Sequence, residues 1–197
     1  MKFPERSLNL LPWIVATAFV AGIVHVVSVL MMPAVAPQDA LARLAQAANA
    51  TPPTQGGVTL LDGDAGAAPL PFEDPAMAEG ACLFDLSKGL LRVRASVDGE
   101  DFIGLSFHSG AGRIFHAMTD HSAIKGKIDI VVGDAKQIGA LETEDAEAAP
   151  VEEVRLTSPT RRGFVLIRSL AKRDSDRPRA LERVRAVSCE TFQPAQE

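Results

Sequence analysis

Three histidines close together in the second half of the chain are the first candidates for chemistry. They are His108, His116 and His121, and Asp120 directly precedes the third. Imidazole and carboxylate groups that converge on one point can hold a metal ion or act as an acid and a base. Their spacing matches no metal-ligand motif, and we expect His108 and His116 on different strands or turns. The sequence therefore predicts no metal site and no cofactor.

Two serines stand in patterns that resemble catalytic motifs. Ser122 is followed by Lys125 at the spacing of penicillin-recognising enzymes, but the two companion motifs of those enzymes are absent. Residues 104–108 (Gly-Leu-Ser-Phe-His) are similar to a nucleophile elbow without its closing glycine. Residues 110–112 (Gly-Ala-Gly) are half of a nucleotide-binding fingerprint, and they are expected to form a turn. None of these patterns predicts an enzyme.

Arg92, Arg94 and Arg113 are candidate ligands for an anion. Guanidinium groups bind carboxylates and phosphates through paired, charge-assisted hydrogen bonds. Arg92 and Arg94 alternate with apolar residues, which also places them on the exposed polar face of a strand. Two interpretations stay open. One is a ligand-binding face of these arginines with His108 and His116, and the other is an ordinary solvated surface.

The two cysteines, Cys82 and Cys189, are too far apart in the sequence to form a local metal site. In an oxidising compartment they can pair, and a disulfide that closes a loop of this size stabilises a protein by about 4–5 kcal/mol in the chain-entropy model. The alternative is two separate buried thiols that pack as small apolar residues. If the cysteines pair, we expect the bond to hold the C-terminal helix against the strand region.

Composition and charge exclude some partners. The chain has 197 residues and a formal net charge of -5. Lys2, Glu5 and Arg6 give the first 32 residues a net charge of +1, so the rest carries -6. An acidic domain argues against binding to nucleic acid and against electrostatic docking on anionic lipid.

A long apolar run from Leu10 to Met32 predicts a transmembrane helix. Its 23 residues carry no formal charge, and as a helix they span about 34 Å, which exceeds the roughly 30 Å of a bilayer core. Lys2 and Arg6 precede the run. The positive-inside rule therefore places residues 1–9 in the cytoplasm and the rest in the periplasm of a bacterial inner membrane.

Cleavage as a signal peptide is the competing interpretation of this run. Residues 34–36 (Ala-Val-Ala) resemble a cleavage site, but Pro37 would follow the cut, and the run exceeds the 7–15 residues of a signal core. We therefore expect an uncleaved anchor. His25 lies near its middle, where it either contacts a partner helix or stays neutral and bonded within its own helix.

Beyond the anchor, residues 33–69 are expected to form a short helix over 37–50 and a linker rich in proline and glycine, with one short strand at 58–61. Residues 70–193 are expected to form the periplasmic domain. Hydrophobic patterning predicts helices over 134–141 and 178–187 and strands over 82–85, 90–97, 102–107, 113–118, 128–132, 151–156 and 164–170.

The order of these elements predicts a mainly β (α+β) fold class. Asp98-Gly99 is a hairpin signal, so successive strands are expected to pair as a meander, without a parallel βαβ unit. The transmembrane helix would then be followed by an antiparallel β-sandwich with short helices.

Several stretches of the chain carry a family resemblance. They are Ala21–Pro33 (AGIVHVVSVLMMP), Asp39–Leu44 (DALARL), Leu70–Ala76 (LPFEDPA), Cys82–Ala95 (CLFDLSKGLLRVRA), Ile128–Gly133 (IDIVVG), Ser158–Thr160 (SPT) and Gly163–Arg168 (GFVLIR). These stretches resemble the small, single-pass members of the bacterial domain-of-unknown-function 1254 family. The resemblance implies a jelly-roll-like β-sandwich and an exported location, and it supplies no activity. It also implies a possible partner protein that carries the domain of unknown function 1214.

Three functional hypotheses follow. The leading one is a non-catalytic binding or assembly module that is tethered to the inner membrane. The second is a cell-envelope enzyme that acts on a glycan or a lipid-linked substrate through a cleft near His108 and His116. The third is a helper subunit whose anchor contacts another membrane helix through His25.

Overall fold

The computed structural model describes residues 5–35, 40–50, 53–61, 74–144 and 152–193. Two compact units divide the chain, Met1–Pro37 and Gln38–Glu197, and each is described by itself. The first unit contains one long helix, α1 (Glu5–Val35). Within it, Leu10–Met32 is long and apolar enough to cross a membrane. His25 is exposed on this helix, and helical structure already begins within the expected tail of residues 1–9.

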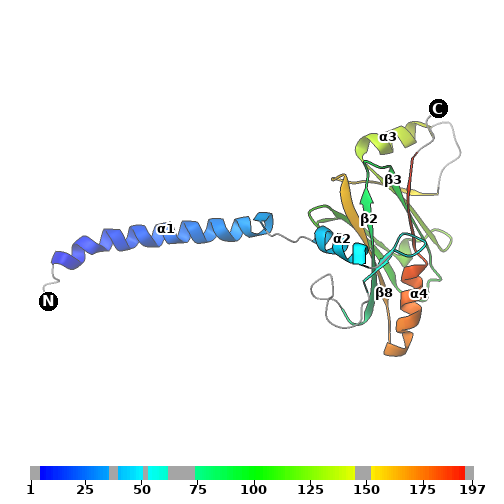
Figure 1. The fold of residues 1–197 in the computed structure, drawn as a ribbon, viewed down its shortest axis with the longest axis horizontal. Coiled ribbons are helices and arrows are strands. Elements are labelled where there is room, and N and C mark those ends of the chain that lie inside the picture. Colours follow the sequence, from blue (N-terminus) through cyan, green and yellow to red (C-terminus); the bar gives the residue numbers. More distant parts are fainter. Residues whose placement is uncertain (1–4, 36–39, 51–52, 62–73, 145–151, 194–197) are drawn as a thin grey trace. The chain divides into compact units, whose positions relative to one another are not determined.

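The second unit contains two sheets (Figure 1). Sheet A has the order β1-β2-β8-β4-β5, and every neighbouring pair in it is antiparallel. Its strands are β1 (Thr59–Leu60), β2 (Met77–Asp85), β4 (Ile103–Ser109), β5 (Ile114–Thr119) and β8 (Arg162–Leu170). Sheet B has the order β7-β6-β3-β9. Its strands are β3 (Leu90–Ser96), β6 (Lys127–Gly133), β7 (Val154–Thr157) and β9 (Ser188–Phe192).

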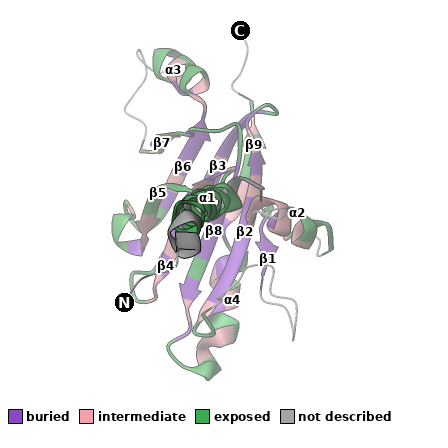
Figure 2. Cartoon of the chain, turned by 90° about the vertical axis from the view of Figure 1, so that its left-hand side faces the viewer, coloured by how far each residue is buried: buried purple, intermediate pink, exposed green. Residues whose placement is uncertain are grey.

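The two sheets contribute to one buried core. Strand β3 turns Leu91, Val93 and Ala95 into it, as the period-two pattern predicts. Sheet A adds Leu105 and Phe107, among others, to the same cluster. Buried residues follow the strands of both sheets, whereas α3 (Ala135–Glu144) is largely exposed (Figure 2). The coarse fold is therefore α+β, with an N-terminal apolar helix that is followed in the sequence by a unit of two sheets.

Residues before 70 also belong to the folded unit. Helix α2 (Ala40–Ala50) packs Leu44 against Ala81, Phe164 and Leu166 on the face of sheet A that points away from the shared core. Val58, just before β1, is completely buried in the shared core. Part of the segment expected to be a linker is therefore folded, since its few apolar residues find partners on sheet A. Residues 62–69 of that segment lie outside the described residues.

The predicted meander is wrong at the turn after β3. Asp98 Oδ1 accepts hydrogen bonds from the backbone N–H groups of Glu100 and Asp101 at 3.1 and 3.4 Å, and Gly99 has a positive φ of 78°. These residues form a loop that carries the chain from sheet B to sheet A rather than a hairpin. Pairing with distant strands decides the partners of β3, which are β6 and β9.

Two further features of sheet B differ from the prediction. Strands β6 and β7 pair in parallel, and α3 lies between them in the chain, so a βαβ unit is present. Strand β9 follows α4 (Arg177–Arg185) at residues where no strand was expected. Because β9 is an edge strand of partly exposed and polar residues, its sequence lacks the apolar alternation that predicts a strand.

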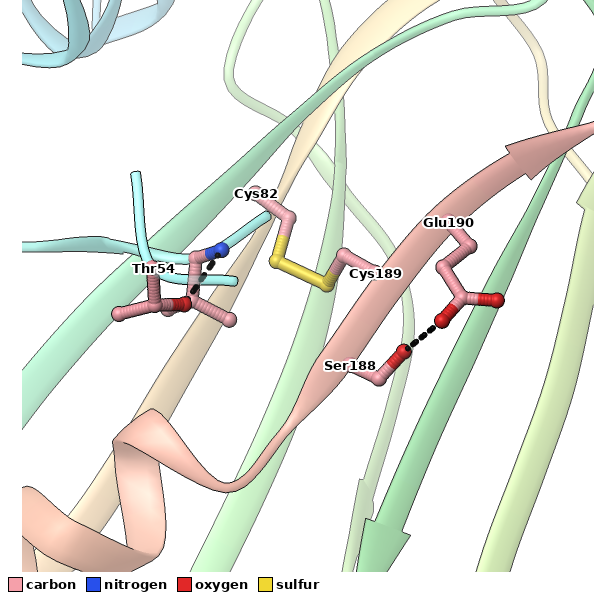
Figure 3. Close-up of a disulfide and its surroundings, with 6 residues drawn as sticks. Thr54, Cys82, Ser188, Cys189 and Glu190 are labelled. Atoms are coloured by element: carbon pink, nitrogen blue, oxygen red, sulfur yellow. Dashed lines mark hydrogen bonds between the residues drawn. A yellow bond between two sulfur atoms is a disulfide. The ribbon is translucent and has the colours of Figure 1, made fainter. Parts of the chain in front are cut away.

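A disulfide joins the two sheets. Cys82 on β2 is bonded to Cys189 on β9, with 6.3 Å between their Cα atoms (Figure 3). The sequence leaves open either a disulfide or two separate buried thiols, and the structure contains the disulfide. The bond holds the edge strand β9 of sheet B to sheet A, rather than holding the C-terminal helix directly.

Candidate functional site

Three polar or small positions share the outer face of β4, the face that points away from the core. Ile103, Leu105 and Phe107 are buried, so the alternate residues Gly104, Ser106 and His108 point the other way. Helix α2 covers β2 and β8 on this outer face of sheet A. We call the part of the face over β4, β5 and the Arg168 end of β8 the β4 face.

Ser106 and His108 contact each other on the β4 face. Ser106 Oγ lies 3.0 Å from His108 Nε2, and His108 Nδ1 lies 3.1 Å from the carbonyl oxygen of Gly112. A carbonyl oxygen can only accept, so Nδ1 carries the hydrogen and Nε2 accepts from the serine hydroxyl. Phe164 stacks on the imidazole with 4.5 Å between the ring centres. Ser106 Oγ also lies 3.5 Å from the carbonyl oxygen of Leu166, but its contact with His108 Nε2 is shorter, so the serine and the histidine form the main donor–acceptor pair.

The surroundings of His108 keep its imidazole neutral. Burial lowers the pKa of His108 below its ordinary value of 6.5, and the positive charge of Arg168 lowers it further. The hydrogen bond to Gly112 opposes this shift but does not cancel it. At neutral pH the ring therefore has a lone pair on Nε2 directed at Ser106.

A cavity of about 370 Å³ opens on the β4 face beside Ser106. Gly104 lies in its lining, where a Cβ would stand 3.0 Å from the Phe102 ring, so the absence of a side chain gives the cavity its depth. The polar residues of the lining are Ser106, Thr119, Ser122 and Arg168, and apolar ones include Phe102 and Ala117. One cationic group and three hydroxyls thus face a partly apolar space.

Arg168 is held in place by a buried carboxylate. Its Nε lies 2.9 Å from Glu79 Oε1, and the two residues are cross-strand neighbours on β8 and β2. The Glu79 side chain is only 6% exposed, whereas that of Arg168 is 50% exposed. Because a buried carboxylate needs a paired charge, this arrangement fixes the guanidinium at the side of the cavity.

The histidines expected to be candidates do not converge. His108 lies on the β4 face, but His116 on β5 packs beside Phe107, with 6.1 Å between the ring centres. The side chain of His121 is 89% exposed, and that of Asp120 is buried. Within the described ranges, no group of three His, Cys, Asp or Glu residues could hold a metal ion. Lys125 pairs with Glu152, so it is engaged away from the serine of the Ser-x-x-Lys pattern.

The predicted arginine set is also divided. Arg92 and Arg94 lie on sheet B, where Asp129 contacts both of them at 2.7 and 3.5 Å. Arg92 also pairs with Glu153, and Arg94 with Glu190. Arg113 is exposed next to β5 of sheet A. Arg92 and Arg94 on sheet B therefore do not share one face with His108 on sheet A, and carboxylates on β6 and β9 contact them.

Asp129 makes the stability of sheet B depend on pH. Burial alone would raise its pKa, but the hydrogen bonds and charges of Arg92 and then Arg94 outweigh burial and lower the pKa below 3.8. A lowered pKa in the folded state stabilises the fold above the unfolded value, and this stability is lost as the pH falls through the folded value.

Asp129→Asn is therefore expected to lower the free energy of unfolding by about 1–2 kcal/mol at pH 7. The difference from wild type should shrink as the pH falls below about 4, because Asp129 then takes up a proton first in the unfolded chain and, at lower pH, in the folded protein. Urea unfolding of the wild type and the variant at several pH values measures this difference in the free energy of unfolding. Asp174→Asn is the control, because Asp174 is exposed. An equal loss at all pH values would contradict the assignment.

Sequence reasoning named His108 as a candidate and compared residues 104–108 with a nucleophile elbow, but it did not join Gly104, Ser106 and Arg168 in one site. The alternation of Gly104, Ser106 and His108 places them on one face, and this signal was available. Arg168 gave no such signal, because its position depends on the register that pairs Gly104 with Arg168 across β4 and β8.

The structure defines a two-sheet α+β domain with a lined cavity, preceded by an apolar helix, and comparisons with known proteins bear on that fold alone. No protein-family model and no curated protein sequence matches the chain. The VPA0106 protein from Vibrio parahaemolyticus has a similar structure, with a TM-score of 0.54 and 13% identity over 80% of this chain. An uncharacterised protein from Burkholderia cenocepacia matches with a TM-score of 0.38 and 13% identity over 68% of this chain. The chain spans 38% and 37% of the lengths of these two proteins.

Proposed function

We propose that this chain is a single-pass inner-membrane protein that presents a periplasmic, jelly-roll-like β-sandwich as a ligand-binding module. Helix α1, with the apolar stretch Leu10–Met32, supports the anchor. The Cys82–Cys189 bond supports the periplasmic side, because thiols stay reduced in the cytoplasm and pair in oxidising compartments. Lys2 and Arg6 ahead of the span support the same orientation.

The cavity on the β4 face carries the binding proposal. Arg168 supplies a positive charge, and Ser106, Thr119 and Ser122 supply hydroxyls that donate to or accept from a polar head group. Phe102 and Ala117 provide apolar contact area. The volume of about 370 Å³ lies at the lower end of ligand pockets. We infer a small anionic ligand, a carboxylate with a short apolar chain, because the cavity has room for only about a dozen water molecules at roughly 30 Å³ each.

Hexanoate is a suitable probe for this proposal. We expect it to bind the full chain in lipid nanodiscs, detected by saturation-transfer NMR, and we expect neutral hexanamide to bind at least ten times more weakly. Gly104→Val should weaken hexanoate binding at least tenfold, because the new side chain occupies the cavity and meets Phe102. A β-branched residue suits a strand, so the fold should persist.

Gly139→Ala is the matched control for this variant. Gly139 lies in α3, and nothing lies within 4 Å of a Cβ added there. Empty nanodiscs report the partition of hexanoate into lipid. Equal binding by the wild type, Gly104→Val and the empty discs would refute the binding site.

The family resemblance adds a second element to the proposal. We infer membership of the domain-of-unknown-function 1254 family, and a protein carrying the domain of unknown function 1214 is the proposed partner. Stretches such as Cys82–Ala95 and Gly163–Arg168 support this inference. Affinity purification of the full chain from solubilised membranes tests it. Recovery of no protein carrying that domain would count against the partnership.

The enzyme alternative is favoured by one specific observation. Ser106 lines the cavity on the β4 face, and its Oγ contacts His108 Nε2 from behind that lining, whereas His116 packs beside Phe107. This pair gives the alternative a definite nucleophile.

A further inference from the structure

We propose that Ser106 is a nucleophile that accepts an acyl group from a carboxylic ester bound in the β4-face cavity, with His108 as its base and Arg168 as the stabiliser of negative charge. The proposal rests on the binding site proposed above and adds a reaction to it. Its substrate class is an ester whose acid part is small and partly apolar.

Three groups in a row give the serine its activation. Ser106 Oγ is 3.0 Å from His108 Nε2, and His108 Nδ1 is 3.1 Å from the Gly112 carbonyl. A nucleophile within hydrogen-bond reach of a base, with the base oriented by a third group, is the arrangement that activates serine hydroxyls. The carbonyl of Gly112 here holds the imidazole in the tautomer that can receive the serine proton.

The surrounding structure keeps these groups in place. Ser106 and His108 flank Phe107, which is completely buried and fixes this part of β4 against the core. Phe164 on the neighbouring strand β8 stacks on the His108 ring. A catalytic group needs such support, because small displacements from the productive geometry cost much of the rate.

The cavity can also stabilise the charge that develops in the reaction. Attack on a carbonyl places a negative charge on its oxygen, and a fixed positive group beside it lowers the barrier. Arg168 lines the same cavity as Ser106. Glu79 contacts its Nε, and a guanidinium has two further nitrogen groups that can donate.

The reaction is an acyl transfer followed by hydrolysis. The Ser106 Oγ–carbonyl bond forms while the serine proton moves to His108 Nε2. The bond between the carbonyl carbon and the alcohol oxygen then breaks, and the alcohol leaves with the proton from His108. A water molecule next attacks the acyl-serine and gives a proton to His108. The carboxylic acid leaves, and Ser106 recovers its proton.

A fluorophosphonate probe tests the nucleophile on the full chain in nanodiscs. Peptide mass spectrometry should find the probe on Ser106, at a rate at least ten times that at Ser96. Ser96 is an exposed serine at the end of β3 and provides the internal reference. Ser106→Ala should remove the label, and Ser96→Ala should leave the rate at Ser106 unchanged.

The role of His108 has its own measurement. His108→Asn should slow labelling of Ser106 by a factor of about 100 or more, the usual contribution of a positioned base. In the wild type the rate should fall as the pH is lowered, with a midpoint below pH 6.5, because the pKa of His108 lies below its ordinary value. Because the pH profile uses the wild type alone, it does not depend on the folding of a variant.

The outcomes separate this proposal from the binding function. Labelling of Ser106 no faster than of Ser96, or no slower after heat denaturation, would overturn the nucleophile and show a purely structural hydrogen bond. Hexanoate binding by the wild type would then still support the binding module. Absence of both labelling and hexanoate binding would reject both proposals.

Discussion

Loss of the disulfide in the double variant Cys82→Ala/Cys189→Ala is expected to lower the free energy of unfolding by about 4–5 kcal/mol. The bond closes a loop with a sequence separation of 107 residues, so it removes many conformations from the unfolded chain. It also joins β2 of sheet A to the edge strand β9 of sheet B, whose residues are partly exposed. The chain has no other cysteine, so no second disulfide can replace this bond.

Urea unfolding of the full chain in detergent, followed by far-ultraviolet circular dichroism of the strand signal, measures this loss. The reduced wild type is the control, because it keeps both cysteine side chains and lacks only the bond. We expect it to lose nearly as much stability as the double variant. Equal stability of the reduced and oxidised wild type would show that the bond contributes little.

A loss of this size bears on the location of the domain. Small domains are stable by only about 5–15 kcal/mol, so the bond is a large part of the total. A domain that depends on it needs an oxidising compartment. A large loss of stability on reduction would therefore support the proposed periplasmic location of the domain. The basic residues before the apolar helix support that location on separate grounds.

Local patterns predicted most individual strands, but strand partners depend on distant residues. The alternation of Leu91, Val93 and Ala95 with arginines gave β3 almost to the residue. The hairpin signal Asp98-Gly99 predicted that β3 pairs with β4, and this prediction was wrong. The register of β3 with β6 and β9 involves residues more than 30 positions away, and no local pattern encodes such a choice.

For the candidate site too, the sequence predicts contacts within one strand but not contacts between strands. The period of a strand places Ser106 and His108 on one face, so their contact follows from sequence once β4 is assigned. The contribution of Arg168 requires the pairing of β8 with β4, and its orientation requires Glu79 on β2. Similarly, Arg92 looks like a free anion ligand until β6 brings Asp129 beside it.

Replacement of Arg183 by methionine is expected to lower the free energy of unfolding by about 2–3 kcal/mol. Arg183 on α4 donates hydrogen bonds to Ser169 Oγ at 2.9 Å, to the Leu170 carbonyl at 3.0 Å and to Asp101 Oδ2 at 2.6 Å. Its side chain is only 20% exposed. Methionine keeps part of the apolar contact and removes all three bonds. Lys172 still pairs with Asp101 in the variant, which limits the loss.

This replacement should also weaken hexanoate binding severalfold, because Arg183 helps to position one wall of the cavity. Ser169 Oγ, which accepts from Arg183, donates to the carbonyl oxygen of Phe102 at 3.2 Å, and the Phe102 side chain lines the cavity. Arg179→Met, at an exposed position of the same helix, is the control and should change stability by less than about 0.5 kcal/mol. Lower stability with unchanged binding would confine Arg183 to holding α4 against sheet A. Loss of both stability and hexanoate binding would show that the hydrogen bonds from Arg183 through Ser169 to Phe102 support the cavity as well as the helix.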